Sequence, residues 1–142
     1  MQHAIIIAYL VAAMRAWVPI AEHTGLGETS AQIEARYSPA FDKCLESPDG
    51  QSTAGMVQCA GVELEVQDKA LNAAYRDLVG DMNARQKANL LKAQRAWIAF
   101  RDADCGARYD PDWGTISTIN ANMCMLRRTV ERTIELEEFI EN

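Results

Sequence analysis

Hydrophobic positions recur at helical spacings in three long segments of this chain. In the first segment, between about residues 53 and 82, the stripe consists of Leu64, Leu71, Tyr75, Leu78 and Met82. These separations of three, four and seven residues place the side chains on one face of a helix, whereas a half-buried strand would alternate every second residue. Residues 84–107 are rich in good helix formers, and apolar residues recur again from about 117 to 140. The pattern predicts an all-α protein with about three long antiparallel helices.

Capping residues mark where these helices begin. Ser followed by Pro, and Asn followed three residues later by Gln, are typical of helix starts because they satisfy or avoid the free backbone N–H groups of the first turn. The expected caps are Ser38 before a short helix over residues 39–46, Ser52 or Thr53, Asn83 with Gln86, and Ser117 or Thr118. A short N-terminal helix therefore precedes the three long ones.

The first 37 residues differ from the rest. Residues 4–14 form an uncharged apolar run, too short for a membrane span of roughly 20 residues but of the length found in secretory signals. We expect a signal peptide over residues 1–21, cleaved after Ala13, Ala16 or Ala21, with no stable membrane span afterwards and a periplasmic or secreted location. No Lys or Arg precedes the apolar run, and an atypical chain start is the alternative. We expect residues 22–37 to be a flexible tail with one turn of helix at most, near residues 31–36, and residues 38–142 to be the folded domain.

Four cysteines support export independently. They are Cys44, Cys59, Cys105 and Cys124. An even number in a small chain is typical of disulfides formed in an oxidising compartment, and four cysteines allow three connectivities. No CxxC pair occurs and both histidines precede residue 24, so we expect no metal site. The predicted pairs are Cys44–Cys59 and Cys105–Cys124, because each pair lies at neighbouring helix ends. Each closed loop is worth about 3 kcal/mol in the chain-entropy model.

Charge and residue content argue against several function classes. The formal net charge of −6 is unsuited to a surface that neutralises nucleic-acid phosphates, and it favours basic partners instead. A Ser–His or Cys–His mechanism needs a histidine in the folded part, and none follows residue 23. Acidic pairs two residues apart on a helix point in different directions, unlike the paired carboxylates of a glycosidase. No glycine-rich phosphate loop is present. We therefore expect neither enzymatic activity nor a cofactor.

Polar groups occupy packing positions on the predicted second long helix. Gln94, Trp97 and Arg101 share one stripe, and Asp104 shares another with Trp97. Buried polar groups require partners. We expect a structural network that holds the helices in register, formed by Gln94, Arg95, Trp97, Arg101, Asp102 and Asp104. Arg101 is expected to be largely covered and paired with a carboxylate, either a local one or an acid on another helix.

This helix also carries a family resemblance. The run AQRAWIAFRDADC, residues 93–105, resembles the signature of the LprI-type domain of bacterial envelope proteins, long catalogued as a domain of unknown function. The remaining matches are Cys44, Met56, Cys59, Glu63-Leu64, Leu71-Asn72, Tyr75, Cys124, Leu126, Arg128, Thr129 and Arg132. The resemblance covers about residues 40–138. It implies an envelope binding domain that blocks a basic hydrolase such as lysozyme, an activity that gave the family its label through one member.

The loop before the last cysteine departs from that pattern. Many relatives have a Gly-Gly-Ser-like turn here, so no ligand contact can be carried over to this loop. It contains Tyr109, Asp110, Asp112 and Trp113, two aromatics beside two acids, which suits the centre of a protein interface. The alternative is that Trp113 packs as core against the helix ends. Two functions follow: an inhibitor of a lysozyme-type hydrolase, or a structural or assembly domain of the cell envelope. The sequence predicts no oligomeric state.

Overall fold

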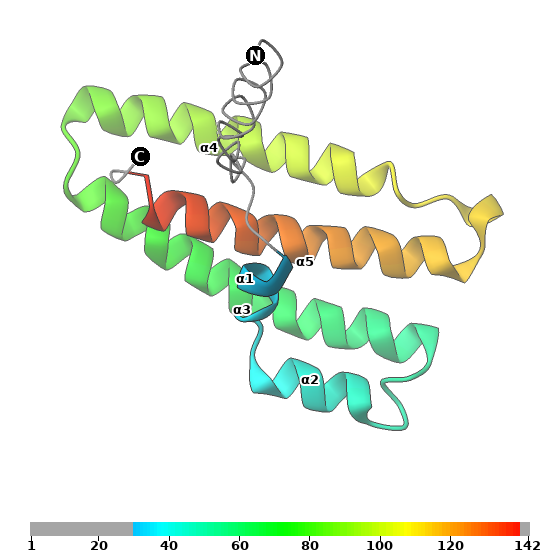
Figure 1. Cartoon of the computed structure of the whole chain (residues 1–142). Coiled ribbons are helices and arrows are strands. Elements are labelled where there is room, and N and C mark those ends of the chain that lie inside the picture. The colour runs from blue at the N-terminus through cyan, green and yellow to red at the C-terminus, as the bar shows by residue number, and fades with distance from the viewer. Residues whose placement is uncertain (1–29, 140–142) are drawn as a thin grey trace, which may run out of the picture.

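The computed structural model describes residues 30–139, and every regular element in that range is a helix (Figure 1). The elements are α1 (Ser30–Glu34), α2 (Pro39–Glu46), α3 (Thr53–Gly80), α4 (Ala84–Gly106), the 3₁₀ turn η1 (Pro111–Trp113) and α5 (Thr115–Glu137). The predicted all-α class is confirmed, and α2 spans the expected residues. The expected signal peptide over residues 1–21, and residues 22–29 of the expected tail, lie outside the described residues.

The three long helices lie beside one another with the last one in the middle. Figure 1 shows α5 between α3 and α4, so that successive helices are antiparallel while α3 and α5 run in the same direction. The α3–α5 contact is the most extensive, and α4 touches mainly α5. Within residues 30–139, no helix combines the length and the apolar character that crossing a membrane demands.

Three of the four predicted caps are present. The side chains of Ser38 and Ser52 accept the N–H groups of their first helical turns, and Asn83 and Gln86 form a reciprocal capping box. The fourth prediction is wrong, because α5 begins at Thr115 with Gly114 as its N-terminal cap. Gly114 has a φ of 73°, a left-handed value that glycine adopts without strain, and this turn starts the helix early. The helix ends at Glu137, about three residues before the expected end near residue 140.

The core is built between α3 and α5. Leu126, Val130 and Leu136 of α5 are at most 1% exposed. Two buried threonines sit among them, and each donates its hydroxyl to a backbone carbonyl four residues earlier (Thr129 to Met125, 2.8 Å), which satisfies the polar atom. By contrast, α4 buries only two of its described residues, a leucine near its start and a cysteine near its end. Polar contacts and a disulfide must therefore hold α4 in place.

The end of the expected tail is folded onto α5. Ile33 of α1 is 2% exposed and packs with Val130 and Ile134. Arg36 forms an ion pair with Glu137 at 2.6 Å. The helical turn expected near residues 31–36 is present as α1, but residues 30–37 pack onto α5, because one apolar side chain finds a pocket that only the assembled helices create.

A buried carboxylate connects this segment to α3. Glu63 is 2% exposed and accepts hydrogen bonds from the Ser38 backbone N–H (2.9 Å) and hydroxyl (2.5 Å). The Gln67 amide donates both to Glu63 (2.7 Å) and to the Arg36 carbonyl (2.8 Å). Three donors thus satisfy the oxygens of one buried carboxyl group, as burial of a polar group requires. In the sequence, Glu63 stands out only as part of the family pattern.

Candidate functional site

Both disulfides have the predicted pairings, although Cys124 lies in the middle of α5 and not at its end. Cys44–Cys59 ties α2 to the start of α3, with 5.8 Å between the Cα atoms, and Cys105–Cys124 ties the end of α4 to α5 at 5.4 Å. The described chain holds no free cysteine. Two disulfides in a small domain are consistent with an extracytoplasmic location, because reducing compartments keep thiols free.

Polar and stacking contacts fill the seam between α4 and α5. The Nε of Arg132 donates to the Gln94 amide oxygen at 3.0 Å. The guanidinium groups of Arg132 and Arg101 lie 5.9 and 5.1 Å from the centre of the Trp97 ring. An aromatic face attracts cations at such distances. The seam thus uses cation–aromatic contacts where most helix pairs use aliphatic packing.

Arg101 bridges all three long helices. Its side chain is 13% exposed, and it donates to the Thr129 hydroxyl of α5 (3.2 Å) and to the neighbouring Asp102 (3.0 Å). The Oδ1 of Asp68 on α3 lies 3.6 Å from the Nη1 of Arg101 and forms an ion pair with it. The planar guanidinium has five donors, so one side chain can reach acceptors on several elements.

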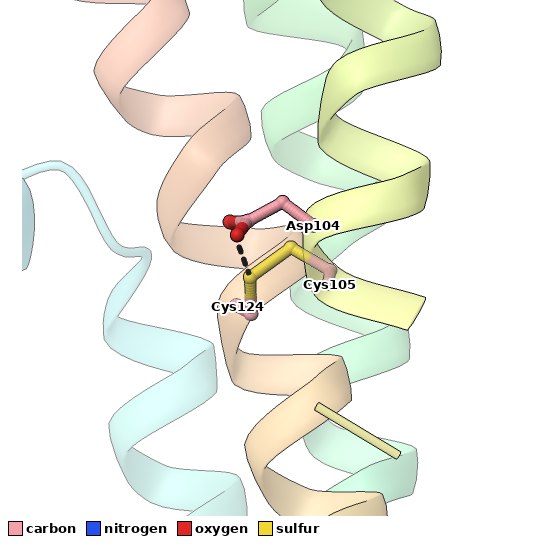
Figure 2. A group of neighbouring side chains, drawn as sticks. All are labelled: Asp104, Cys105 and Cys124. Atoms are coloured by element: carbon pink, nitrogen blue, oxygen red, sulfur yellow. Dashed lines mark hydrogen bonds between the residues drawn. A yellow bond between two sulfur atoms is a disulfide. The ribbon is translucent and has the colours of Figure 1, made fainter. Parts of the chain in front are cut away.

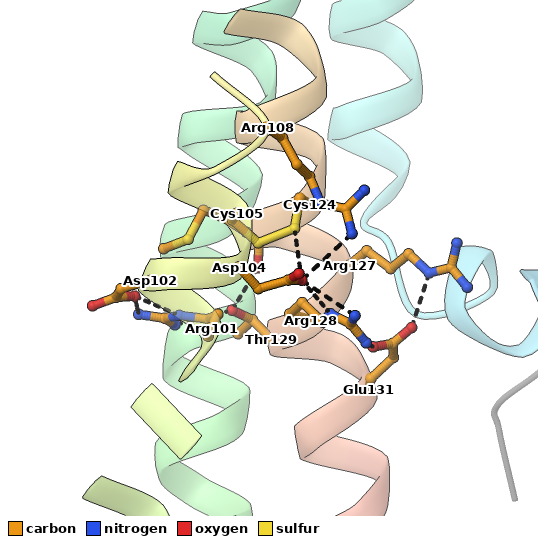
Figure 3. The surroundings of a disulfide bond; sticks show 11 residues. Arg101, Asp102, Asp104, Cys105, Arg108, Cys124, Arg127, Arg128, Thr129 and Glu131 are labelled. Atoms are coloured by element: carbon orange, nitrogen blue, oxygen red, sulfur yellow. Dashed lines mark hydrogen bonds and ion pairs between the residues drawn. A yellow bond between two sulfur atoms is a disulfide. The ribbon is translucent and has the colours of Figure 1, made fainter. Parts of the chain in front are cut away.

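A second polar cluster surrounds Asp104 next to the disulfide (Figure 3). Its Oδ2 accepts from Arg128 at 3.2 and 3.3 Å and from Arg108 at 3.4 Å. Glu131 is shared between Arg127 (2.9 Å) and Arg128 (3.0 Å). Burial lowers the pKa of Arg128, but the bonds to Glu131 and Asp104 outweigh this effect, and the pKa ends above its usual value. Arg128 therefore carries its positive charge at neutral pH.

Asp104 also touches the disulfide itself. Figure 2 shows its carboxylate against Cys124, with 3.8 Å between Oδ2 and the sulfur. A sulfur in a disulfide has no hydrogen to donate, so this is a packing contact. The ligand atoms of Asp104, Cys105 and Cys124 lie within 4.8 Å of one another. Metals bind cysteine as the thiolate. Cys105 and Cys124 form a disulfide and therefore offer no thiolate ligand.

All the residues expected in the structural network take part in it except Arg95. Gln94, Trp97, Arg101, Asp102 and Asp104 take part in the contacts above. Arg95 is exposed and has no polar partner within residues 30–139, so it lies outside the network. The network also contains four residues of α5 that were not predicted to belong to it. They are Arg128, Thr129, Glu131 and Arg132. The sequence pattern that could have identified them is the spacing of polar residues, three and four apart, on the helix that became α5.

The loop after α4 has a defined shape. Asp110 accepts the Asp112 backbone N–H at 2.9 Å and thereby caps η1. The buried hydroxyl of Ser117 donates to the carbonyl of Asp110 at 2.8 Å and contacts that of Gly114 at the same distance. The Asp110 carboxylate is therefore partly engaged within the loop, while Asp112 is exposed.

The two aromatic residues of the loop face solvent. Tyr109 is 53% exposed and Trp113 is 62% exposed. Of the two alternatives for Trp113, the structure therefore supports the surface position and contradicts the core one. Ile116, the next exposed apolar residue, is 56% exposed. Loop and helix start together present apolar area at one end of the bundle, of the kind that interfaces bury.

Comparison with known proteins assigns the family. The model of the family described as "Lysozyme inhibitor LprI" matches residues 44–136, which contain both disulfides, α4 and the loop. An uncharacterized protein of Rhizobium meliloti (strain 1021) is 33% identical over 98 residues, covering 59% of this chain and 70% of that relative. No solved structure matches the chain. This protein belongs to the LprI lysozyme inhibitor family.

Proposed function

We propose that this protein acts outside the cytoplasm as a non-catalytic binding domain that inhibits a lysozyme-type cell-wall hydrolase. The family match over residues 44–136 is the observation that carries the proposal. The disulfides agree with an oxidising compartment, and the net charge of −6 suits a basic partner.

The contact surface that we propose is the loop from Tyr109 to Trp113. Aromatic side chains dominate binding energy at many interfaces because they bury large areas with little loss of conformational freedom. Backbone and side-chain bonds already fix this loop, with Asp110 and Ser117 as its internal ties. A preformed loop has less conformational entropy to lose on binding, which favours affinity.

The two acids of the loop have different roles in this proposal. Asp112 is exposed and meets a basic group on the hydrolase, whereas Asp110 contributes negative charge while it caps η1. Asn keeps an oxygen in the capping position, so Asp110→Asn removes the charge and leaves the loop geometry intact. Charge pairs at an interface rim mainly set the association rate and its salt dependence.

The test is inhibition of a c-type lysozyme acting on suspended bacterial cell walls. The disulfide-bonded protein is expected to inhibit in a salt-sensitive manner, Trp113→Ala to speed dissociation, and Asp110→Asn with Asp112→Asn to slow association. Phe139→Ala is the matched control. Phe139 is an exposed aromatic residue (48%) that follows the C-terminal end of α5, whereas the loop precedes the N-terminal end of that helix. Undiminished inhibition by a folded Trp113→Ala variant refutes the loop as contact surface, and absence of inhibition by the unaltered protein refutes the function.

A structural or assembly role in the envelope is the second candidate. The observation in its favour is an apolar strip on α3, where Val62 (60% exposed) and Val66 (43% exposed) lie one helical turn apart. Such a strip suits a protein contact that involves neither the loop nor a hydrolase. Stable capture of a second envelope protein by a Trp113→Ala variant, together with loss of capture by Val62→Ser, supports this role over inhibition.

A further inference from the structure

A groove runs along the face of the bundle between α1 and the end of α4. Its floor is α5, Tyr37 lies on the α1 side, and Arg108 and Trp113 lie on the opposite side. The groove has a volume of about 900 Å³. That volume falls within the range of sites that hold small organic molecules.

Arginine side chains gather at the groove. Three of them line it, Arg108, Arg127 and Arg128, together with two glutamates, Glu34 and Glu131. Asp104 pairs with two of these arginines, so the positive and negative charges at the groove balance, whereas the whole chain has a formal net charge of −6. The groove therefore repels an anion less than the acidic surface as a whole does.

The arginines have more donors than the neighbouring carboxylates use. Arg108 and Arg128 share one oxygen of Asp104, and Arg127 and Arg128 share Glu131. Within the part of the chain that the structure describes, Arg127 donates only through its Nε and Arg108 only through one terminal nitrogen. Their side chains are 54% and 48% exposed. Figure 3 shows the end of Arg127 extending toward the α1 segment, so its terminal nitrogens are open to the groove.

Aromatic and apolar groups complete the lining. Tyr37 packs edge-on against Phe41, with 5.3 Å between the ring centres, and burial raises its pKa, so the phenol is neutral at neutral pH. Trp113 stands exposed at the opposite rim, and Met123 lies on the floor. An aromatic face beside guanidinium groups suits a ligand with a ring next to its anionic group.

We propose that this groove binds a small ring-bearing organic oxyanion, with the carboxylate or phosphate held by Arg108 and Arg127 and the ring against Trp113. Guanidinium groups match both oxyanions in geometry and bind them through paired hydrogen bonds. This binding goes beyond inhibition of a hydrolase and needs no hydrolase to be observed.

The test is an NMR titration of the disulfide-bonded protein, read at the Trp113 indole and the arginine Nε–H signals. Glucose 6-phosphate and glucuronate represent the two oxyanions. Both are expected to shift these signals saturably, with affinity falling as salt is added. Glucose is expected to cause no shift at the same concentration, and inorganic phosphate to bind more weakly than glucose 6-phosphate because it has no ring.

Variants decide whether the named arginines are responsible. Arg127→Gln is expected to weaken binding at least about tenfold, as loss of charged hydrogen bonds implies, and Arg108→Gln to act similarly. Arg95→Gln is the matched control, since Arg95 is an exposed arginine of α4 that does not line the groove. Equal weakening by Arg95→Gln, unchanged binding by Arg127→Gln, or no saturable shift with either oxyanion overturns the proposal. Equal affinity for phosphate and glucose 6-phosphate overturns the role of the ring.

Discussion

Substitution of Arg101 tests the idea that polar contacts hold α4 in place. Arg101 is 13% exposed and contacts Trp97, Thr129, Asp102 and Asp68. We expect Arg101→Ala to lower the free energy of unfolding by about 2 to 3 kcal/mol. The ring contact contributes about 0.5 to 2 kcal/mol, and the Thr129 bond about 0.5 to 1.5 kcal/mol.

The carboxylates contribute little to that sum. Side chains of Asp68 and Asp102 are 45% and 53% exposed, so neither is left as a buried unpaired charge when Arg101 is removed. Exposed ion pairs are worth about 0 to 1 kcal/mol. Most of the cost of Arg101→Ala therefore comes from the lost contacts with Trp97 and Thr129.

Urea unfolding of three variants measures these contributions. Arg101→Met keeps the apolar stem and loses the donors, so it is expected to cost about half as much as Arg101→Ala. Arg95→Ala makes the same change of helix propensity at an exposed position without partners, and it is expected to stay within about 0.5 kcal/mol of the unaltered protein. Added salt is expected to change the Arg101→Ala effect little. A midpoint unchanged by Arg101→Ala, or shifted as much by Arg95→Ala, contradicts the reasoning.

Three further predictions concern the rest of the fold. Glu63→Ala is expected to cost about 3 kcal/mol more in urea unfolding than Glu63→Gln, which keeps one acceptor oxygen for the buried donors; equal costs would contradict this. Replacing both Cys105 and Cys124 by Ala opens a loop with a sequence separation of 19 and is expected to cost about 3 kcal/mol, with hydrogen-exchange protection lost first at the end of α4; uniform loss along α3 and α4 argues against it. Burial raises the pKa of Tyr37 above 10.0, so the unfolded chain ionises first, and this contribution to stability is present below that pH and declines as pH rises through the folded-state pKa. Tyr37→Phe is therefore expected to reduce the alkaline loss of stability, measured by unfolding at about pH 9 and about pH 11, whereas the exposed Tyr109→Phe is not.

Local features were predictable because they depend on neighbours in the sequence. Ser38, Ser52 and Asn83 cap helices through bonds to backbone groups three residues later. The disulfide pairing was predictable because each pair joins successive helices across one short connection, with sequence separations of 15 and 19. The predicted start of α5 at Ser117 or Thr118 was wrong. The left-handed turn at Gly114 and the burial of Ser117 depend on how the loop folds back, which the local sequence does not specify.

The helical class, most helix limits, the disulfide pairs and the family resemblance were all predictable from the amino-acid sequence. These features arise from periodicity, capping and spacing, all of which act over a few residues or one connection. Other features became known only from the packed helices. These are the position of α5 between α3 and α4, the burial of Ile33, the hydrogen bonds from Ser38 to Glu63 and the exposure of Trp113. Each depends on which helix faces meet, a choice made by packing between segments far apart in the chain, because a stripe of apolar residues specifies a buried face but not the partner that covers it.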